Sequence, residues 1–274
     1  MRFKDSISAL AAIFTAAALL TGCSGDNVTP ASSDGQVAIA EEESSSEPTE
    51  PEPETDLPSD EDLEAYFSAV STYDVGDLQS AMELTEPGSI AEAYVGYILG
   101  SANAAIDGGL PIEGTEPDKV DGGYESCPTE VEDDCVTWAD VEGRDGKVVT
   151  FTVNGEELDE RLSAGSGREV AAGDLAAMTL MYAYQSVQSD ALFVVAEVTS
   201  NDAPVTIATY DATYRSPTGR QSTAAQSAGP SDLAADSTAT VVVAFPNAEP
   251  GGTASVSFFS EDFMTEAVAA LETR

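Results

Sequence analysis

Met178-Thr-Leu-Met-Tyr-Ala-Tyr184 and Leu192-Phe-Val-Val-Ala-Glu-Val198 are the two stretches that decide the fold. In each, apolar side chains recur at every second position. In the first stretch these are Met178, Leu180, Tyr182 and Tyr184, and in the second Leu192, Val194, Ala196 and Val198. The same pattern returns in Val241, Val243 and Phe245 and again in Ala254, Val256 and Phe258. A period of two predicts strands that bury one face.

Turn signals separate these strands. Asn201-Asp202 follows the second strand, and Ser216-Pro217-Thr218-Gly219 has the signature of a type I turn, with Pro second and Gly fourth. Gly251-Gly252 precedes the last apolar stretch. From about Arg168 onward, short alternating strands divided by turns predict an antiparallel, immunoglobulin-like β-sandwich over residues 166–274.

Two segments of this region, Phe193–Ile207 and Asp232–Pro246, resemble the extracellular immunoglobulin-like domains of many Gram-positive lipoproteins, of the DUF4352 kind. The shared features are a strand that ends in an Asn-containing turn, then Leu-x-x-x-Ser and a Val-rich strand ending in Pro. This chain departs from the pattern at Ala235-Asp236, where Pro-Gly is usual. The resemblance implies a fold and an extracytoplasmic setting, and it implies no chemistry.

Residues 59–109 have a helical pattern. Ser59 has the form of an N-cap with acids in the first turn, and Leu63, Tyr66, Phe67 and Val70 follow at helical spacing. A second helix is expected from Asp77 to Pro87-Gly88, and a third from about Ser89 to Ile106, ended by Gly108-Gly109. Tyr66, Tyr73, Tyr94 and Tyr97 either line a groove or pack this helical part, and we expect packing.

Residues 110–165 are expected to hold a loop, a disulfide and a β-meander. Residues 110–125 show no periodicity and are interpreted as loop. Asp145-Gly146 and Asn154-Gly155 are hairpin turns between alternating stretches. Trp138, the one tryptophan, is interpreted as a core residue of this meander rather than a ligand platform.

Cys127 and Cys135 form an even pair in a chain expected to be exported, so a disulfide is predicted. The nine-residue ring is worth about 2.5 kcal/mol by loop entropy. The ring also contains four acids that offer a calcium site as an alternative, but without the alternating spacing of an EF-hand. These acids are Glu130, Glu132, Asp133 and Asp134. We therefore predict no metal site and no cofactor.

The C-terminal stretch from Ser260 to Leu271 is expected to form a short helix. Its spacing places Phe263, Ala267 and Leu271 on the inward side.

The N-terminus has the order of a secretory signal. Arg2 and Lys4 precede an apolar run from Ile7 to Leu20, and Leu20-Thr21-Gly22-Cys23 follows. This stretch resembles the lipobox of bacterial lipoproteins. The resemblance implies cleavage before Cys23 and a diacylglyceryl group on its thiol. The alternative is a transmembrane helix, but the run is shorter than the roughly 20 residues that span a bilayer.

The sequence predicts five parts: a lipoprotein signal at 1–22, a tether at 23–58, helices at 59–109, the disulfide loop and meander at 110–165, and the sandwich at 166–274. The tether is rich in Ser, Pro and acids, and we expect it to be disordered, because it has too little apolar surface to offset the entropy of ordering. The whole arrangement resembles actinobacterial lipoproteins without assigned activity.

The charge restricts the function. With 50 acidic and 10 basic residues the formal net charge is −40, so nucleic-acid binding is not expected. The chain holds no His, which excludes Ser-His-Asp and Cys-His nucleophiles. We expect a non-catalytic binding module on the outer face of the cell membrane, with an envelope or secreted protein or a wall polymer as partner. The alternatives are a carboxylate-based envelope hydrolase and a calcium-stabilised structural module.

Overall fold

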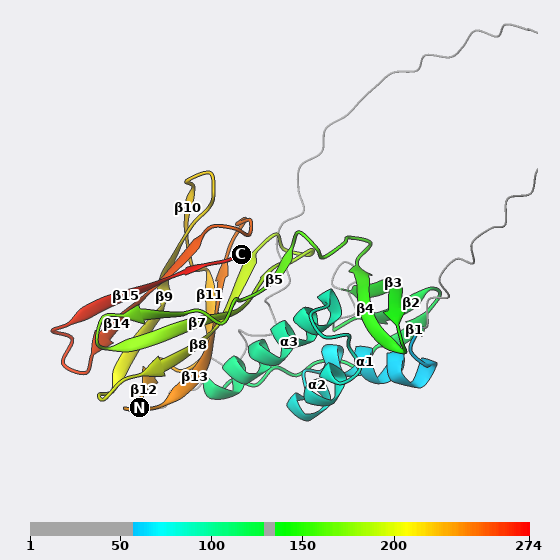
Figure 1. Ribbon diagram of the computed structural model, residues 1–274, viewed down its shortest axis with the longest axis horizontal. Coiled ribbons are helices and arrows are strands. Elements are labelled where there is room, and N and C mark those ends of the chain that lie inside the picture. Colours follow the sequence, from blue (N-terminus) through cyan, green and yellow to red (C-terminus); the bar gives the residue numbers. More distant parts are fainter. Residues whose placement is uncertain (1–56, 129–134) are drawn as a thin grey trace, which may run out of the picture. The chain divides into compact units, whose positions relative to one another are not determined.

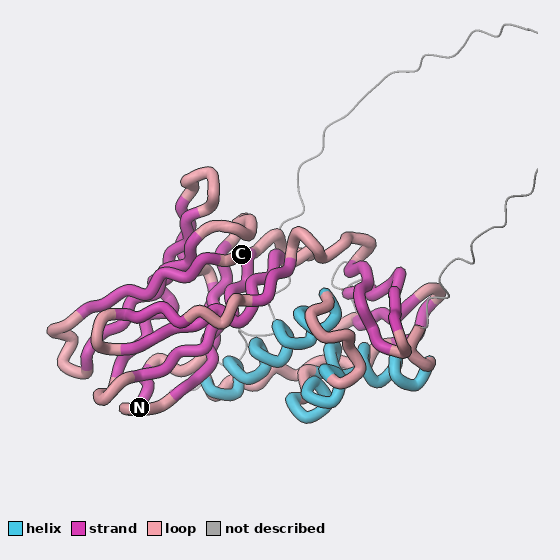
Figure 2. Tube along the Cα trace, in the orientation of Figure 1, coloured by secondary structure: helices cyan, strands magenta, loops and turns pink. Residues whose placement is uncertain are grey.

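The computed structural model describes residues 57–128 and 135–274, in which three helices precede a mainly antiparallel β-structure (Figures 1 and 2). The predicted signal segment and nearly all of the predicted tether lie outside the described residues. The helices are α1 (Asp60–Thr72), α2 (Val75–Met82) and α3 (Ile90–Asp107). None of the helices in the described part is long and apolar enough to cross a membrane.

Each predicted helix start is confirmed to within a few residues. The Ser59 hydroxyl accepts a hydrogen bond from the Asp62 amide at 3.2 Å, and Ser89 caps α3 in the same way. The second helix begins at Val75 rather than Asp77, because Asp74 accepts from the amides of Gly76 and Asp77.

Eleven strands make two packed sheets in the C-terminal half. The first sheet has the order β11-β13-β8-β7-β5, with β6 also paired to β7. Its strands are β5 (Leu162–Ala164), β6 (Glu169–Ala172), β7 (Ala176–Gln185), β8 (Leu192–Ser200), β11 (Gln226–Ala228) and β13 (Thr238–Phe245). The second has the order β10-β9-β14-β15, with β12 paired to β9. Its strands are β9 (Val205–Arg215), β10 (Gln221–Thr223), β12 (Asp232–Leu233), β14 (Thr253–Ser260) and β15 (Glu266–Glu272).

The core between these sheets confirms the predicted faces of β8, β13 and β14. Val194 of β8, Val243 of β13 and Phe258 of β14 are at most 2% exposed and belong to one cluster. Burial of apolar side chains contributed by two facing sheets is what holds a β-sandwich together.

The predicted face of β7 is wrong over its second half. Met178 and Leu180 lie in the sandwich core, but the register with β8 shifts between Leu180 and Tyr182. The extra residue turns Tyr182 and Tyr184 to the opposite face and brings Ala183 into the core instead. Apolar residues on both faces of β7 conceal this bulge in the sequence.

Helix α3 packs on that opposite face, against β13, β7 and β8. Two glycines allow the close approach: a Cβ on Gly100 would lie 2.6 Å from Val195 Cγ1, and one on Gly96 would overlap the Tyr182 hydroxyl. A second core cluster therefore joins the helices, the meander and the outer face of the first sheet, including Val195, Tyr184 and Val242.

The meander is a four-stranded sheet of β1 (Asp118–Val120), β2 (Gly123–Ser126), β3 (Val136–Arg144) and β4 (Lys147–Val153). The two predicted turns are confirmed, with φ of 51° and 73° at Asp145-Gly146 and 51° and 77° at Asn154-Gly155. The loop predicted for residues 110–125 is wrong in part, because it contains β1, the start of β2 and an Asp121-Gly122 turn. β1 is a short edge strand with mostly exposed side chains, so it has no hydrophobic alternation.

The predicted C-terminal helix is also wrong. Residues Glu266–Glu272 form β15, which pairs with β14, and Phe263 is 65% exposed rather than inward. Ala269 and Leu271 are buried. The alternation around them is the strand period, and the open edge of β14 supplies the backbone hydrogen bonds that a strand needs.

Candidate functional site

The predicted lipid attachment residue Cys23 and the signal peptidase residues Leu20, Thr21 and Gly22 lie outside the described residues. The structure therefore does not describe how these four residues are arranged. The anchor stays a prediction from the sequence.

The predicted disulfide is present. Cys127 and Cys135 are bonded, with Cα atoms 4.2 Å apart, directly after β2 and before β3. The Glu125 carboxylate lies 3.7 Å from Cys127 Sγ and accepts a hydrogen bond from the Thr137 hydroxyl at 3.2 Å. Glu125 and the two sulfurs are close enough to suggest a metal site, but disulfide sulfurs offer no thiolate ligand. The four acids of the ring lie outside the described residues.

The tyrosines of the helical part pack the second core, as predicted. Tyr66, Tyr94 and Tyr97 are at most 8% exposed, and the Tyr66 hydroxyl donates to the Ala91 carbonyl at 3.0 Å. Burial raises the pKa of all three phenols, and the neighbouring phenol of Tyr184 adds to the rise for Tyr94. These three side chains stabilise the fold, whereas Tyr73, the fourth tyrosine of the prediction, is only partly buried against the same core and also lines a surface hollow.

Trp138 is a core residue, also as predicted. Its ring is 3% exposed and lies 5.9 Å from that of Phe67, and its indole N–H donates to the Tyr94 hydroxyl with 3.4 Å between Nε1 and Oη. The hydrogen bond links β3 to α3. Sugar stacking on this indole is therefore blocked by its packing.

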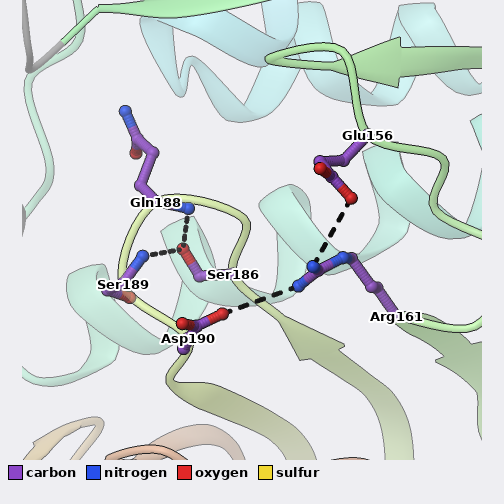
Figure 3. A network of polar contacts seen from close by, with 6 residues as sticks. All are labelled: Glu156, Arg161, Ser186, Gln188, Ser189 and Asp190. Atoms are coloured by element: carbon purple, nitrogen blue, oxygen red, sulfur yellow. Dashed lines mark hydrogen bonds and ion pairs between the residues drawn. The ribbon is translucent and has the colours of Figure 1, made fainter. Parts of the chain in front are cut away.

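A polar network around Arg161 was not predicted (Figure 3). The guanidinium of Arg161 lies 3.6 Å from the Glu156 carboxylate and 3.8 Å from that of Asp190. Asp190 closes a loop in which the Ser186 hydroxyl accepts from the amides of Gln188 and Ser189. The network joins the turn after β4 to the loop between β7 and β8. Its carboxylates neutralise the cation, so its geometry is that of a structural link.

A polar hollow of about 590 Å³ lies at one end of the sandwich. It is lined by Asp174, Thr199, Ser200, Asn201, Asp202 and Asp236. The Asn201 side chain donates to the Asp174 carbonyl at 2.9 Å, and the Asp236 amide donates to the Asn201 carbonyl at 2.9 Å. Asp236 has φ of 52°, so at the corner where Pro-Gly is usual this chain places an aspartate in the left-handed region.

The three acids of this hollow do not converge. In residues 57–128 and 135–274 the one group of acids and cysteines within metal-binding distance is that of Glu125 and the disulfide. The hollow is open and acidic, and its walls are the end of β8 and the neighbouring turns, where the Ser200 hydroxyl accepts a hydrogen bond from the Ser237 amide at 3.0 Å. Its geometry permits contact with a cationic group.

A second hollow, of about 460 Å³, lies where α1 meets α2, beside the C-terminal end of α3. It is lined in part by Tyr73, Val75, Ala102, Ile106 and Ile112, and Asp74 and Glu113 add two carboxylates. Ile106 is 52% exposed. Both hollows are open depressions on the surface of the described part.

Comparison of the chain with models of known protein families finds no matching family, and comparison with curated proteins finds no match.

Proposed function

We propose that the chain is a lipid-anchored lipoprotein on the extracytoplasmic face of the cell membrane, and that its folded part is a non-catalytic interaction module. The lipid anchor is supported by the order of the N-terminal residues. Arg2 and Lys4 come first, the apolar run from Ile7 to Leu20 follows, and Leu20-Thr21-Gly22-Cys23 ends it. Two acyl chains on one residue give stable anchoring, which a single chain does not.

The Cys127–Cys135 disulfide supports an extracytoplasmic location. Disulfides persist in exported proteins and are rare in reducing cytosol. A bilayer holds the protein through acylated Cys23, and a wall polymer or an envelope or secreted protein is the partner of the folded part. The whole chain has a formal net charge of −40 and the folded part is also strongly acidic, so attraction of the folded part to anionic lipid or to nucleic acid is not expected.

The non-catalytic role rests on where the aromatic and charged side chains lie. Trp138 and the helical tyrosines pack the core, and Arg161 lies between two carboxylates. The remaining surface offers open depressions and exposed loops. Such a surface binds macromolecules through a few anchoring side chains rather than by surrounding a substrate.

The anchor is tested by metabolic labelling with an alkyne analogue of palmitate. The parent should be labelled and the Cys23→Ala variant should not. The Cys127→Ser, Cys135→Ser double variant is the control, because it removes the other two cysteines and should keep the label. Equal labelling of Cys23→Ala and the parent would contradict the anchor.

The non-catalytic role is tested by incubating the purified protein with peptidoglycan and with a panel of glycans. We expect no release of soluble product above that of heat-denatured protein. Turnover that disappears when Asp174 and Asp236 are both changed to Asn, and that survives the same change at Asp159, would instead establish a carboxylate-based hydrolase.

A further inference from the structure

The hairpin that joins β14 to β15 holds two large apolar side chains in solvent. Phe263 is 65% exposed and Met264 is 83% exposed. The ring of Phe259, at the end of β14, lies 6.0 Å from that of Phe263. Val268 of β15 is 51% exposed and is paired with Ser257, two residues before Phe259 on β14. We call Phe259, Phe263, Met264 and Val268 the hairpin patch.

Hydrogen bonds fix the loop that carries the patch. The Phe263 amide donates to the Ser260 carbonyl at 2.8 Å, and the Ser260 amide donates to the Thr265 carbonyl at 3.0 Å. Asp262 accepts from the Ser260 hydroxyl at 2.7 Å and from the Met264 amide at 3.1 Å. The loop is therefore ordered before any partner arrives, which lowers the entropic cost of binding.

Phe263 has φ of 57°, in the left-handed region that glycine occupies without strain. A bulky residue at such a position is an outlier, and its ring is mostly exposed, with the Phe259 ring as its aromatic neighbour. Strained positions of this kind concentrate at binding sites. The folded chain alone does not explain the aromatic ring at this position.

Acids surround the patch. Glu261, Asp262 and Glu266 flank Phe263 and Met264, and the sequence has no Lys or Arg between Arg220 and Arg274. The hydrogen bonds to the Asp262 carboxylate lower its pKa, so it stays charged at neutral pH. An anionic bilayer would be repelled by these charges, whereas a protein surface with basic side chains would be attracted.

We propose that the hairpin patch is the docking surface for a protein partner that presents an apolar face bordered by Lys or Arg. Phe263 and Met264 pack against that face, and Glu261, Asp262 and Glu266 pair with the basic residues at its border. This inference rests on the proposed interaction function and names its surface. If the patch is not used, the interaction function can still act through another face, and the labelling test of Cys23 is independent of both.

The direct test follows the methionine methyl groups of the full chain by NMR while an amphipathic Leu/Lys helical peptide is added. Met264 is exposed, whereas Met178 is 1% exposed and serves as the internal control. We expect the Met264 methyl signal to shift saturably and the Met178 signal to stay. A Ser/Lys peptide of equal charge should shift neither. Binding of the Leu/Lys peptide with the Met264 signal unmoved would overturn the proposal.

Substitutions distinguish binding by the hairpin patch from nonspecific attraction to the acidic surface. The Phe263→Gly, Met264→Ser pair should weaken binding of the Leu/Lys peptide at least tenfold. Its melting temperature should not fall, because glycine relieves the positive φ. Tyr210→Ser is the matched control, since Tyr210 is 67% exposed on β9, outside the hairpin, and it should bind as the parent does. Equal affinity of the double variant and the parent would refute the docking surface.

Charge reversal tests the role of the acids that flank the hairpin patch. Glu261→Lys with Glu266→Lys should weaken binding at least tenfold, whereas Glu61→Lys in α1 should change it less than twofold. A parallel titration uses vesicles of phosphatidylcholine with phosphatidylglycerol. A Met264 shift with these vesicles but not with the peptide would assign the patch to membrane contact and overturn the proposed protein partner.

Discussion

Gly96 of α3 lies directly under the Tyr182 ring of β7, so close that a Cβ on Gly96 would come within 2.9 Å of Tyr182 Cε1 and nearer still to its hydroxyl. Tyr182 reaches this position because the bulge in β7 turns it away from the sandwich core. A helix and a strand that are about ninety residues apart in the sequence are thereby held in contact.

The first prediction concerns this contact. Gly96→Ala should lower the free energy of unfolding, because overpacking costs about 1–3 kcal/mol, of which the better helix propensity of Ala offsets about 1 kcal/mol. Urea denaturation gives the value. Gly96→Ala combined with Tyr182→Leu should be less destabilising than the sum of the single changes, since the ring that clashes is gone. Additive effects would show that the two residues are not in contact.

The second prediction concerns the hydrogen bond from Trp138 to Tyr94. Tyr94→Phe leaves the buried indole N–H without an acceptor, so the free energy of unfolding should fall by about 1–3 kcal/mol. Equilibrium denaturation followed by Trp fluorescence reports it from the residue concerned. Tyr210→Phe, at an exposed position, should stay within about 0.5 kcal/mol of the parent. An equally small effect at Tyr94 would mean that water replaces the acceptor.

The third prediction concerns alkaline pH. Burial raises the pKa of Tyr184 to about 12, above its ordinary value of 10.0. In the unfolded chain the phenol ionises from about pH 10, whereas in the folded chain it stays neutral until about pH 12. The contribution of Tyr184 to the free energy of unfolding is therefore complete below pH 10 and is lost as the pH rises from about 10 to about 12. At 1.36 kcal/mol per pH unit the loss is about 2–3 kcal/mol.

The measurement is the urea midpoint at pH 9, 10.5 and 11.5. The Tyr184→Phe variant should lose stability less steeply with pH than the parent. Tyr94 and Tyr97 have pKa values raised in the same direction by burial and should leave a residual slope. A parent whose stability does not change between pH 9 and 11.5 would contradict the burial of these phenols.

The fourth prediction concerns the Cys127–Cys135 ring. Opening a ring of this size should lower the free energy of unfolding by about 2–3 kcal/mol. The Cys127→Ser, Cys135→Ser variant and the parent treated with reductant should therefore have the same urea midpoint, below that of the oxidised parent. Insensitivity of the parent to reductant would show that the ring contributes little or resists reduction, and the double variant distinguishes these outcomes.

Strand alternation predicted most of the sandwich because the apolar residues of β8, β13 and β14 face one shared core. The prediction of a C-terminal helix failed because the spacing of the apolar residues fits both the helical period and the strand period. Ala267 and Leu271 are four residues apart, which fits a helix, and they also alternate with Ala269, which fits a strand. Pairing with β14 decides between these, and the sequence of the segment alone does not record that partner.

The hairpin patch was missed for the same reason. The helix expected from Ser260 placed Phe263 inward, so its exposure and its left-handed backbone could not be foreseen. The disulfide, by contrast, followed from counting cysteines. The Arg161 network depends on loops that the fold brings together, and no local sequence pattern predicts it.

The packing of α3 on the outer face of β7, β8 and β13 limits how the protein can be divided. A fragment that starts at residue 166 would expose Tyr184, Val195 and Val242 to water, and we expect such a fragment to aggregate or to be degraded. The sandwich is therefore not an exchangeable module. Recombination during evolution, or grafting in the laboratory, has to carry the helices along with it.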